Sequence, residues 1–211
     1  YGDSPNFIKG LKELQTRFEV YKNKKLFSIN EKFSIDDSKH SPFGVSKTAG
    51  DLYVQEYGKY FGLKTISFRC GCITGPNHKG AELHGFLSYL VSCIIKNKHY
   101  KIFGYKGKQV RDNIHSNDLV SCFWEYYKKP GYGEVYNMGG GRYSNCSIIE
   151  ALNMVENIAG IKIKKKILKQ NRVGDHIWYV SNTRKFKKKY PNWKQKFSTR
   201  RIITELVDQF S

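Results

Sequence analysis

Apolar and polar residues along the chain form segments whose periodicity changes between that of a helix and that of a strand. In residues 46–60, Ala49, Leu52 and Tyr53 occupy neighbouring positions on a helix, and the apolar run within 61–70 predicts a turn followed by a buried strand. Strand and helix signals continue to alternate toward the C-terminus. This alternation is typical of α/β proteins.

The remaining elements follow from the same pattern together with capping signals. Strands are predicted at 101–104, 110–116, 134–141 and 161–168, and helices at 82–96, after Asn117 or Asp118 as a cap, at 147–158, after Asn182 and after Ser198 as a cap. Ser147 and Glu150 have the spacing of a capping box, and Gly160 is expected to end that helix. Trp193 is predicted to anchor a core.

Length and composition indicate a globular protein. A chain of 211 residues, 39% hydrophobic and 15% aromatic, can bury a core and fits one or two domains. No run approaches 18 apolar residues, and the first five residues lack the features of a signal peptide, so we expect a cytoplasmic protein without a membrane span. Five cysteines without a C-x-x-C pair indicate reduced thiols and no metal site.

The charge is strongly positive, with 37 Lys and Arg against 18 Asp and Glu and a net charge of +19. The excess is densest in two runs, at 162–170 and 184–190. Such runs can bind a phosphate backbone through counterion release. The alternative, which we favour, is a solvated lysine-rich surface, because single apolar residues facing a core interrupt both runs.

The first candidate chemistry is an aromatic residue followed four positions later by a lysine. Phe43 and Lys47 stand at this spacing near the start of the predicted helix, which puts both side chains on one helical face. In a dehydrogenase, such a lysine holds a cofactor ribose and lowers the pKa of a tyrosine that acts as acid or base. The spacing alone is common by chance.

Five sequence blocks give this pair a context: SPFGVSK (41–47), TISFRCGCITGP (65–76), GKQVRDNIHSNDL (107–119), VYNMGGG (135–141) and RVGDHIWYVSNTRK (172–185). Together they resemble the extended short-chain dehydrogenase/reductase superfamily of NAD-dependent nucleotide-sugar epimerases and dehydratases. Within it, the segments 1–6, 55–65, 75–91 and 103–116 look most like the CDP-paratose 2-epimerase branch.

The resemblance implies a fold and a place for this chain within it. We expect an α/β protein, the C-terminal half of an extended Rossmann-type, doubly wound fold plus a smaller α/β substrate-binding domain. Residues 1–75 and 109–146 would belong to the Rossmann part, and 76–108 and 147–211 to the substrate domain. The glycine-rich loop that holds the NAD pyrophosphate does not occur in the sequence. We therefore expect a longer enzyme of about 300 residues or more, acting as a homodimer.

The resemblance also assigns roles to individual residues. Lys47 and Cys70 would contact the cofactor, Lys47 at the nicotinamide ribose. The residues expected to bind the nucleotide-sugar are Arg111 and Arg172 at the pyrophosphate, Asp175 at the nucleotide ribose, Phe103 along the base, and Asn77 and His78 toward the sugar. Two guanidinium groups suit a diphosphate because each can donate two charge-assisted hydrogen bonds. Without the resemblance, Arg111 reads as half of a structural ion pair with the Asp that follows it.

Two positions depart from the family pattern. Phe43 stands where the family has its catalytic tyrosine, and Cys72 stands where it has a substrate-binding asparagine. A phenyl ring exchanges no proton, so a proton would have to pass through Cys72, Tyr1, His40 or a water held by Ser41. His84 and His115 are interpreted as packing residues.

The expected function is NAD-dependent epimerisation of a CDP-hexose or another nucleotide-diphosphate sugar through a transient keto-sugar. This chain alone is expected to be inactive. The alternatives are a non-catalytic nucleotide-sugar binder, which Phe43 favours, and a basic nucleic-acid-binding module built from 161–190.

Overall fold

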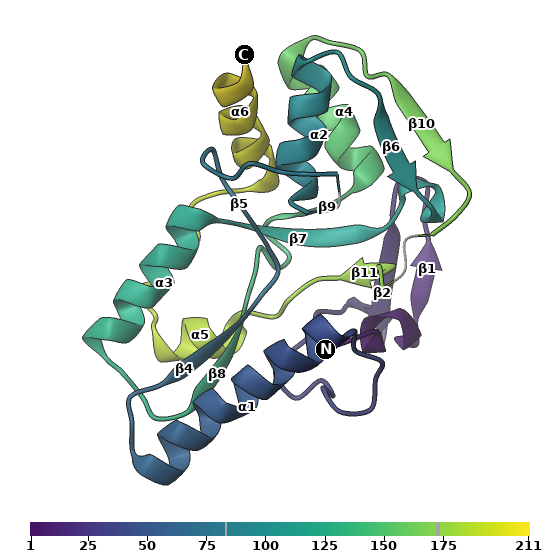
Figure 1. The fold of residues 1–211 in the computed structure, drawn as a ribbon. Helices are drawn as coiled ribbons and strands as arrows, with labels where there is room; N and C mark the ends of the chain where they lie inside the picture. The colour runs from purple at the N-terminus through teal and green to yellow at the C-terminus, as the bar shows by residue number, and fades with distance from the viewer. Residues whose placement is uncertain (83, 172–173) are drawn as a thin grey trace.

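The computed structural model describes residues 1–82, 84–171 and 174–211 and shows a mixed α/β protein (Figure 1). Its helices are η1 (Ser4–Phe7), α1 (Pro42–Phe61), α2 (Phe86–Ile95), η2 (Tyr105–Gly107), α3 (Ser116–Lys128), α4 (Ile148–Ala159), α5 (Arg184–Lys189) and α6 (Thr199–Phe210). Its strands are β1 (Leu11–Glu13), β2 (Phe18–Lys22), β3 (Lys25–Leu26), β4 (Ile66–Cys70), β5 (Cys72–Thr74), β6 (Tyr100–Phe103), β7 (Val110–His115), β8 (Glu134–Met138), β9 (Asn145–Ser147), β10 (Lys165–Leu168) and β11 (Trp178–Tyr179).

Strands β4 and β8 form a parallel pair covered by helices on both faces (Figure 1). Successive side chains on β4 point to opposite faces, as the pleat requires. Arg69 forms an ion pair of 2.7 Å with Asp51 of α1, whereas Phe68 packs against Phe123 of α3 and Phe186 of α5. The predicted strand is therefore present, although it is half-buried rather than fully buried.

Strand β7 lies between the two ends of the molecule, and short strands pair with it on both sides (Figure 1). β5 and β11 pair with β7 in parallel, and β9 pairs with it antiparallel. Gly71 joins β4 to β5, and a side chain there would collide with Asp112 of β7. A parallel arrangement of this kind places the carboxyl ends of β5 and β7 at one edge.

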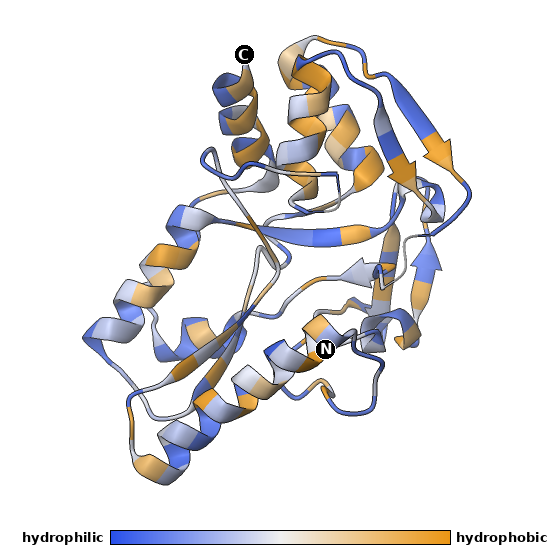
Figure 2. Ribbon diagram, viewed as in Figure 1, coloured by the Kyte–Doolittle hydropathy of each residue, from blue (hydrophilic) through white to orange (hydrophobic). Residues whose placement is uncertain are grey.

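The other end of the molecule is a helical layer made of α2, α4 and α6, beside the parallel pair β6–β10. Figure 2 shows hydrophobic residues concentrated on α2 and α4, and these residues belong to one buried cluster that α6 completes with Ile202, Ile203 and Leu206. The burial of such side chains supplies the main free energy that holds this layer together.

The antiparallel sheet β1–β2–β3 was not anticipated from the sequence. Its strands are short, and Asn23 and Lys24 form the turn between β2 and β3 with positive φ angles. The sheet is fixed by burial of Val20 beside Val110 and Trp178, which are distant in sequence. Contacts between residues so far apart cannot be predicted from the local pattern of apolar and polar residues.

Capping explains which helix boundaries were predicted correctly. Ser147 and Glu150 form the expected capping box, Gly160 ends α4 in a left-handed conformation, and the Ser198 hydroxyl caps α6. The prediction of Asn117 or Asp118 as the cap of α3 was wrong, because Nδ1 of His115 accepts the backbone N–H of Asn117 at 3.1 Å.

Two helices also begin at residues other than those predicted. Helix α1 begins at Pro42 with Ser41 as its cap, four residues before the predicted start, and α2 begins at Phe86 rather than at residue 82. His115 packs as expected, stacked on Phe197 at 3.9 Å, whereas His84 is exposed and the packing interpretation was wrong there. Within the described residues, no helix has both the length and the apolar character needed to cross a bilayer.

Candidate functional site

A cavity of about 170 Å³ lies where the helical layer meets β6 and β7. Its walls come from β5, β6, β7, the starts of α2 and α4, and the segments before α2, β7 and β11. The residues that give it chemical character are Cys72, Lys101, Phe103, Gln109, Arg111 and Asp175. Its volume lies below the roughly 300 Å³ at which pockets begin to hold a whole drug-sized ligand, so it suits one part of a larger ligand.

Arg111 and Asp175 meet across this cavity. A guanidinium Nη2 of Arg111 forms an ion pair with the Asp175 carboxylate, and Nη1 donates to the Val110 carbonyl at 2.7 Å. The two side chains are only 13% and 21% exposed. Because both charges are largely removed from water, the loss of either partner would leave the other as an unpaired, buried charge. The pair also places a guanidinium at the cavity, where it can bind an anion that enters.

The structure separates Arg111 from the aspartate that follows it. Adjacent residues on a strand face opposite sides, and Asp112 instead accepts hydrogen bonds from the backbone of Gly141 and Ser181, each at 2.9 Å. Asp112 is fully buried, and burial raises the pKa of its carboxyl. The Arg111–Asp112 ion pair considered from the sequence alone therefore does not form.

The segment that carries Asp175 is held by the first residues of the chain. Asn6 donates to the Asp175 carbonyl at 3.1 Å and accepts the Ile177 N–H at 2.7 Å. Nε2 of His176 donates to the Gly2 carbonyl at 2.7 Å. Burial, with the nearby Arg111 charge, lowers the pKa of His176 to about 4, so the ring is neutral near pH 7.

The two cysteines singled out from the sequence are poor proton carriers at neutral pH. Burial raises the pKa of Cys72 to about 11 and that of Cys70 to about 11. The condition for Cys72 to act as an acid or base was a lowered pKa, and the structure shows the opposite shift. Cys72 lines the cavity, whereas Cys70 does not, and each of the five cysteines, all in the described part of the chain, carries a free thiol.

Phe43 and Lys47 lie on the first turns of α1, away from the residues that line the cavity. The Lys47 ammonium is 5.2 Å from the centre of the Phe43 ring, and Phe43 is 71% exposed. The predicted proximity of this pair on one helical face is confirmed. Lys47 has no carboxylate within ion-pair distance in the described ranges, so its charge faces solvent.

The other proposed proton carriers are engaged in structural hydrogen bonds. The Tyr1 hydroxyl donates to Asn137 at 2.6 Å and accepts from Arg69 at 3.3 Å, and burial raises its pKa. Nε2 of His40 lies 2.8 Å from the Ile35 carbonyl. The Ser41 hydroxyl caps α1 by accepting from Gly44 at 3.1 Å.

Of the predicted substrate residues, Phe103, Arg111 and Asp175 come together at the cavity. Asn77 and His78 do not line it: Asn77 is exposed, and the His78 N–H donates to the Gly75 carbonyl at 3.0 Å in the turn after β5. Arg172 lies outside the described residues. Gln109 and His176 were missed from the sequence, although Gln109 stands two residues before Arg111, at the spacing that puts both on one side of an extended chain.

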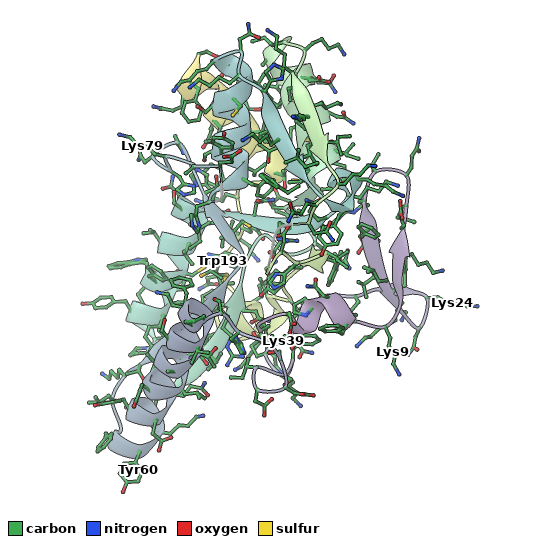
Figure 3. The ribbon with its side chains drawn as sticks, turned by 45° about the vertical axis from the view of Figure 1, so that its right-hand side comes forward. Lys9, Lys24, Lys39, Tyr60, Lys79 and Trp193 are labelled. Carbon is green, nitrogen blue, oxygen red and sulfur yellow. The ribbon has the colours of Figure 1, made fainter. Side chains whose placement is uncertain are left out.

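The basic runs do not form one surface. Residues 165–168 form β10 at the helical end beside β6, whereas 184–189 form α5 against β8 at the opposite end (Figure 1). Figure 3 shows Lys79 on the side of the molecule opposite Lys9 and Lys24. The positive charge is therefore spread over the molecule.

The profile of the "NAD dependent epimerase/dehydratase family" matches residues 19–139, more than half of the chain. The chain belongs to this family. The family assignment confirms the resemblance seen in the sequence blocks, and NAD is the cofactor of the family.

Curated members of the epimerase/dehydratase family match over most of the chain. CDP-paratose 2-epimerase of Salmonella typhi is 27% identical over 176 residues, which cover 80% of this chain and 51% of that protein. dTDP-glucose 4,6-dehydratase of Escherichia coli is 27% identical over 159 residues, which cover 71% of this chain and 43% of that protein. The chain thus spans about half the length of these curated relatives.

Solved structures of the family share the fold. A tyrosine-to-phenylalanine variant of UDP-glucuronic acid 4-epimerase from Bacillus cereus, in complex with UDP-4-deoxy-4-fluoro-glucuronic acid and NAD, has a TM-score of 0.74 at 24% identity, covering 88% of this chain and 57% of that one. dTDP-glucose 4,6-dehydratase from Bacillus anthracis in complex with NAD has a TM-score of 0.75 at 24% identity, covering 88% and 56%. The α/β, Rossmann-type fold predicted from the sequence is confirmed.

One residue at the start of α1 has properties that suit the family's cofactor. The unpaired Lys47 ammonium at the start of α1 has the charge and exposure to hold a ribose hydroxyl. The glycine-rich turn that cradles a dinucleotide pyrophosphate is not among the 211 residues.

Proposed function

We propose that this chain carries the substrate-binding part and a portion of the cofactor-binding part of an NAD-dependent nucleotide-sugar epimerase that acts on a CDP-hexose. The observation that carries the proposal is the cavity in which the Arg111–Asp175 pair meets Phe103. In this assignment, residues 76–108 and 147–211 form the substrate side, and 1–75 with 109–146 form the cofactor side of a longer protein. CDP-paratose 2-epimerase, a relative that matches 80% of the chain, supports the choice of a CDP-sugar.

Four residues of the cavity would contribute to binding in different ways. Arg111 donates charge-assisted hydrogen bonds to the diphosphate, whose negative charge persists at all physiological pH values. One Asp175 carboxylate oxygen accepts a hydrogen bond from a ribose hydroxyl of the nucleotide, while the other stays near Arg111. The Phe103 ring lies along the base. Cys72, neutral because burial raises its pKa to about 11, contributes shape rather than charge.

The chemistry follows from the family's cofactor. NAD, when bound, supplies a reversible hydride acceptor for oxidation of a ring carbon of the sugar to a ketone. Lys47 would hold the nicotinamide ribose, and the neighbouring residue at the tyrosine position is Phe43, which carries no proton. Tyr1 and His40 are engaged in hydrogen bonds that support the fold. Proton transfer is therefore the step for which this chain offers the fewest suitable side chains.

A second candidate function is nucleotide-sugar binding without turnover. Phe43 favours it, because the family's acid/base hydroxyl is missing at that position. The variant of UDP-glucuronic acid 4-epimerase in which a tyrosine is replaced by phenylalanine was captured with both a nucleotide-sugar analogue and NAD. Loss of one tyrosine hydroxyl is therefore compatible with binding in this fold.

Helix α1 gives a reason to expect a homodimer in the complete protein. Seven large hydrophobic side chains along it are exposed: Phe43, Val45, Leu52, Tyr53, Tyr57, Tyr60 and Phe61. An exposed apolar surface of this kind marks a contact surface more often than a solvated one. Light scattering of the complete protein tests this expectation by its mass in solution.

Product analysis of the complete protein with CDP-paratose and NAD tests the function. We expect the C2 epimer to form slowly, and Phe43→Tyr to raise turnover at least about 10-fold, as expected for a restored general acid/base. Phe7→Tyr, at a similarly exposed position that does not line the cavity, is the control and should leave turnover unchanged. Absence of product in both the wild type and Phe43→Tyr, with CDP still bound, would identify the protein as a binder.

A further inference from the structure

The backbone on either side of His176 is held by one side chain from the start of the chain. The Asn6 amide donates from Nδ2 to the Asp175 carbonyl at 3.1 Å and accepts the Ile177 N–H with Oδ1 at 2.7 Å. A carbonyl only accepts and a backbone N–H only donates, so these partners fix which end of the amide is which. Asn6 belongs to η1 and stands 169 residues before Asp175 in the sequence.

The two hydrogen bonds of Asn6 have the pattern of a parallel β-ladder. In such a ladder, a residue donates to the carbonyl before its opposite residue and accepts from the N–H after it. The Asn6 amide makes both bonds around His176. Residues 174–177 belong to no helix or strand. The amide therefore supplies the bonds that a neighbouring strand would supply.

The position of the Asp175 carboxylate depends on the backbone that Asn6 holds. Oδ1 of Asp175 accepts the His176 N–H at 3.1 Å and also accepts from Arg111. Ile177 is fixed at both of its backbone groups, because its carbonyl accepts the Val110 N–H at 3.0 Å. The Arg111–Asp175 pair therefore joins β7 to a segment whose second support is Asn6.

We propose that Asn6 is a positioning residue that holds Asp175 against Arg111 at the wall of the cavity. Its consequence for ligand binding rests on the proposed function, whereas its contacts do not. Without the amide, the Asp175 carbonyl and the Ile177 N–H lose their partners, and the segment is no longer held in one place. The carboxylate then meets both Arg111 and an entering ligand in a less defined position, which weakens binding.

Hydrogen exchange of the complete protein without ligand, read at the Ile177 amide by NMR, tests the contact itself. Asn6→Leu replaces the amide by two methyl groups of similar shape, and exchange should become at least about 10-fold faster, the equivalent of one hydrogen bond. Asn6→Ser, whose side chain is too short to make both bonds, should give the same result. Unchanged exchange in both variants would overturn the inference.

The matched control for hydrogen exchange is Asn145→Leu. Asn145 is half-buried like Asn6, donates to the Gly141 carbonyl at 2.9 Å and accepts from Arg17, and does not line the cavity. Its replacement should leave exchange at Ile177 within about twofold, because Asn145 has no contact with the 175–177 segment. The same acceleration as in Asn6→Leu would overturn the inference, because the effect would then come from a general loosening of the fold.

Titration calorimetry with CDP tests whether Asn6 acts through Asp175. Asn6→Leu should weaken CDP binding about 10-fold in the wild type and at most about twofold in the Asp175→Ala background, because the group that it positions is then gone. No loss in the wild type, or an equal loss in both backgrounds, would overturn the positioning role. Failure of the wild type to bind CDP would refute the proposed function, whereas exchange at Ile177 would still decide whether Asn6 holds the segment.

Discussion

The cavity around Arg111 and the first turns of α1 differ in how far their functional side chains are buried and held by neighbouring residues. At the cavity, Arg111 and Asp175 are largely buried and ion-paired, and Arg111 also donates to a backbone carbonyl. At the start of α1, Phe43 and Lys47 are exposed, with the Lys47 ammonium 5.2 Å from the centre of the Phe43 ring. The region proposed to bind the nucleotide is therefore held in place by neighbouring residues, whereas the region proposed to meet the cofactor is exposed. We therefore expect substitutions in the two regions to affect nucleotide binding and turnover differently.

The largest contrast in stability is expected between Asp112→Ala and Phe43→Ala. Asp112 accepts two backbone N–H groups beneath the cavity, and its removal leaves both buried and unpaired. We expect a loss of about 3 kcal/mol or more in the free energy of unfolding. The exposed Phe43 should cost no more than about 0.5 kcal/mol. Urea denaturation of the two variants measures the difference, and equal losses would remove the contrast between the regions.

The next effect is a pH dependence specific to the Asp175 segment. The folded-state pKa of His176 is about 4, below the unfolded value of 6.5, so the unfolded chain binds the extra proton between these values. Stability should be full above pH 6.5 and fall as the pH drops toward 4, by on the order of 2–3 kcal/mol. His176→Gln should flatten this part of the curve, as measured by thermal melts from pH 4 to 7. The same slope in His176→Gln and wild type would assign it to another group.

The smallest contrast compares two helix caps. Ser147 is fully buried, accepts from Glu150 at 3.0 Å and donates to the Thr16 carbonyl at 2.7 Å, whereas the exposed Ser41 only accepts from Gly44. Replacement by Ala should cost about 2 kcal/mol at Ser147 and about 0.5–1 kcal/mol at Ser41. Denaturation midpoints check the ranking. A larger loss at Ser41 would show that α1 is more tightly integrated than its exposure indicates.

The sequence predicted those parts of the fold that depend on neighbours in the chain. The box of Ser147 and Glu150 and the cap at Ser198 are local, and both are present. The sheet β1–β2–β3 was missed because burial of Val20 against Trp178 sets it, across more than 150 residues. The early start of α1 had a readable signal, Pro42 directly after Ser41, which is the usual order of a cap and first helical residue.

The candidate site was predicted in part. Arg111, Phe103 and Asp175 were named together only through the family resemblance, since their spacing along the chain gives no reason for contact. The pKa shifts of individual groups could be predicted only with the structure, because burial causes them. Burial raises the pKa of Cys72 and lowers that of His176, and neither degree of burial can be inferred from neighbouring residues in the sequence.

The most direct test of the central claim is the affinity for CDP of the wild type, Arg111→Met and Lys47→Met, measured by titration calorimetry. If the cavity binds the nucleotide diphosphate, Arg111→Met should weaken binding at least about 10-fold, because a charge-assisted hydrogen bond to phosphate is lost. Lys47→Met removes the same charge from the exposed start of α1 and should leave the affinity within about twofold. Equal affinities in the wild type and Arg111→Met would contradict the account, since the nucleotide would then bind elsewhere.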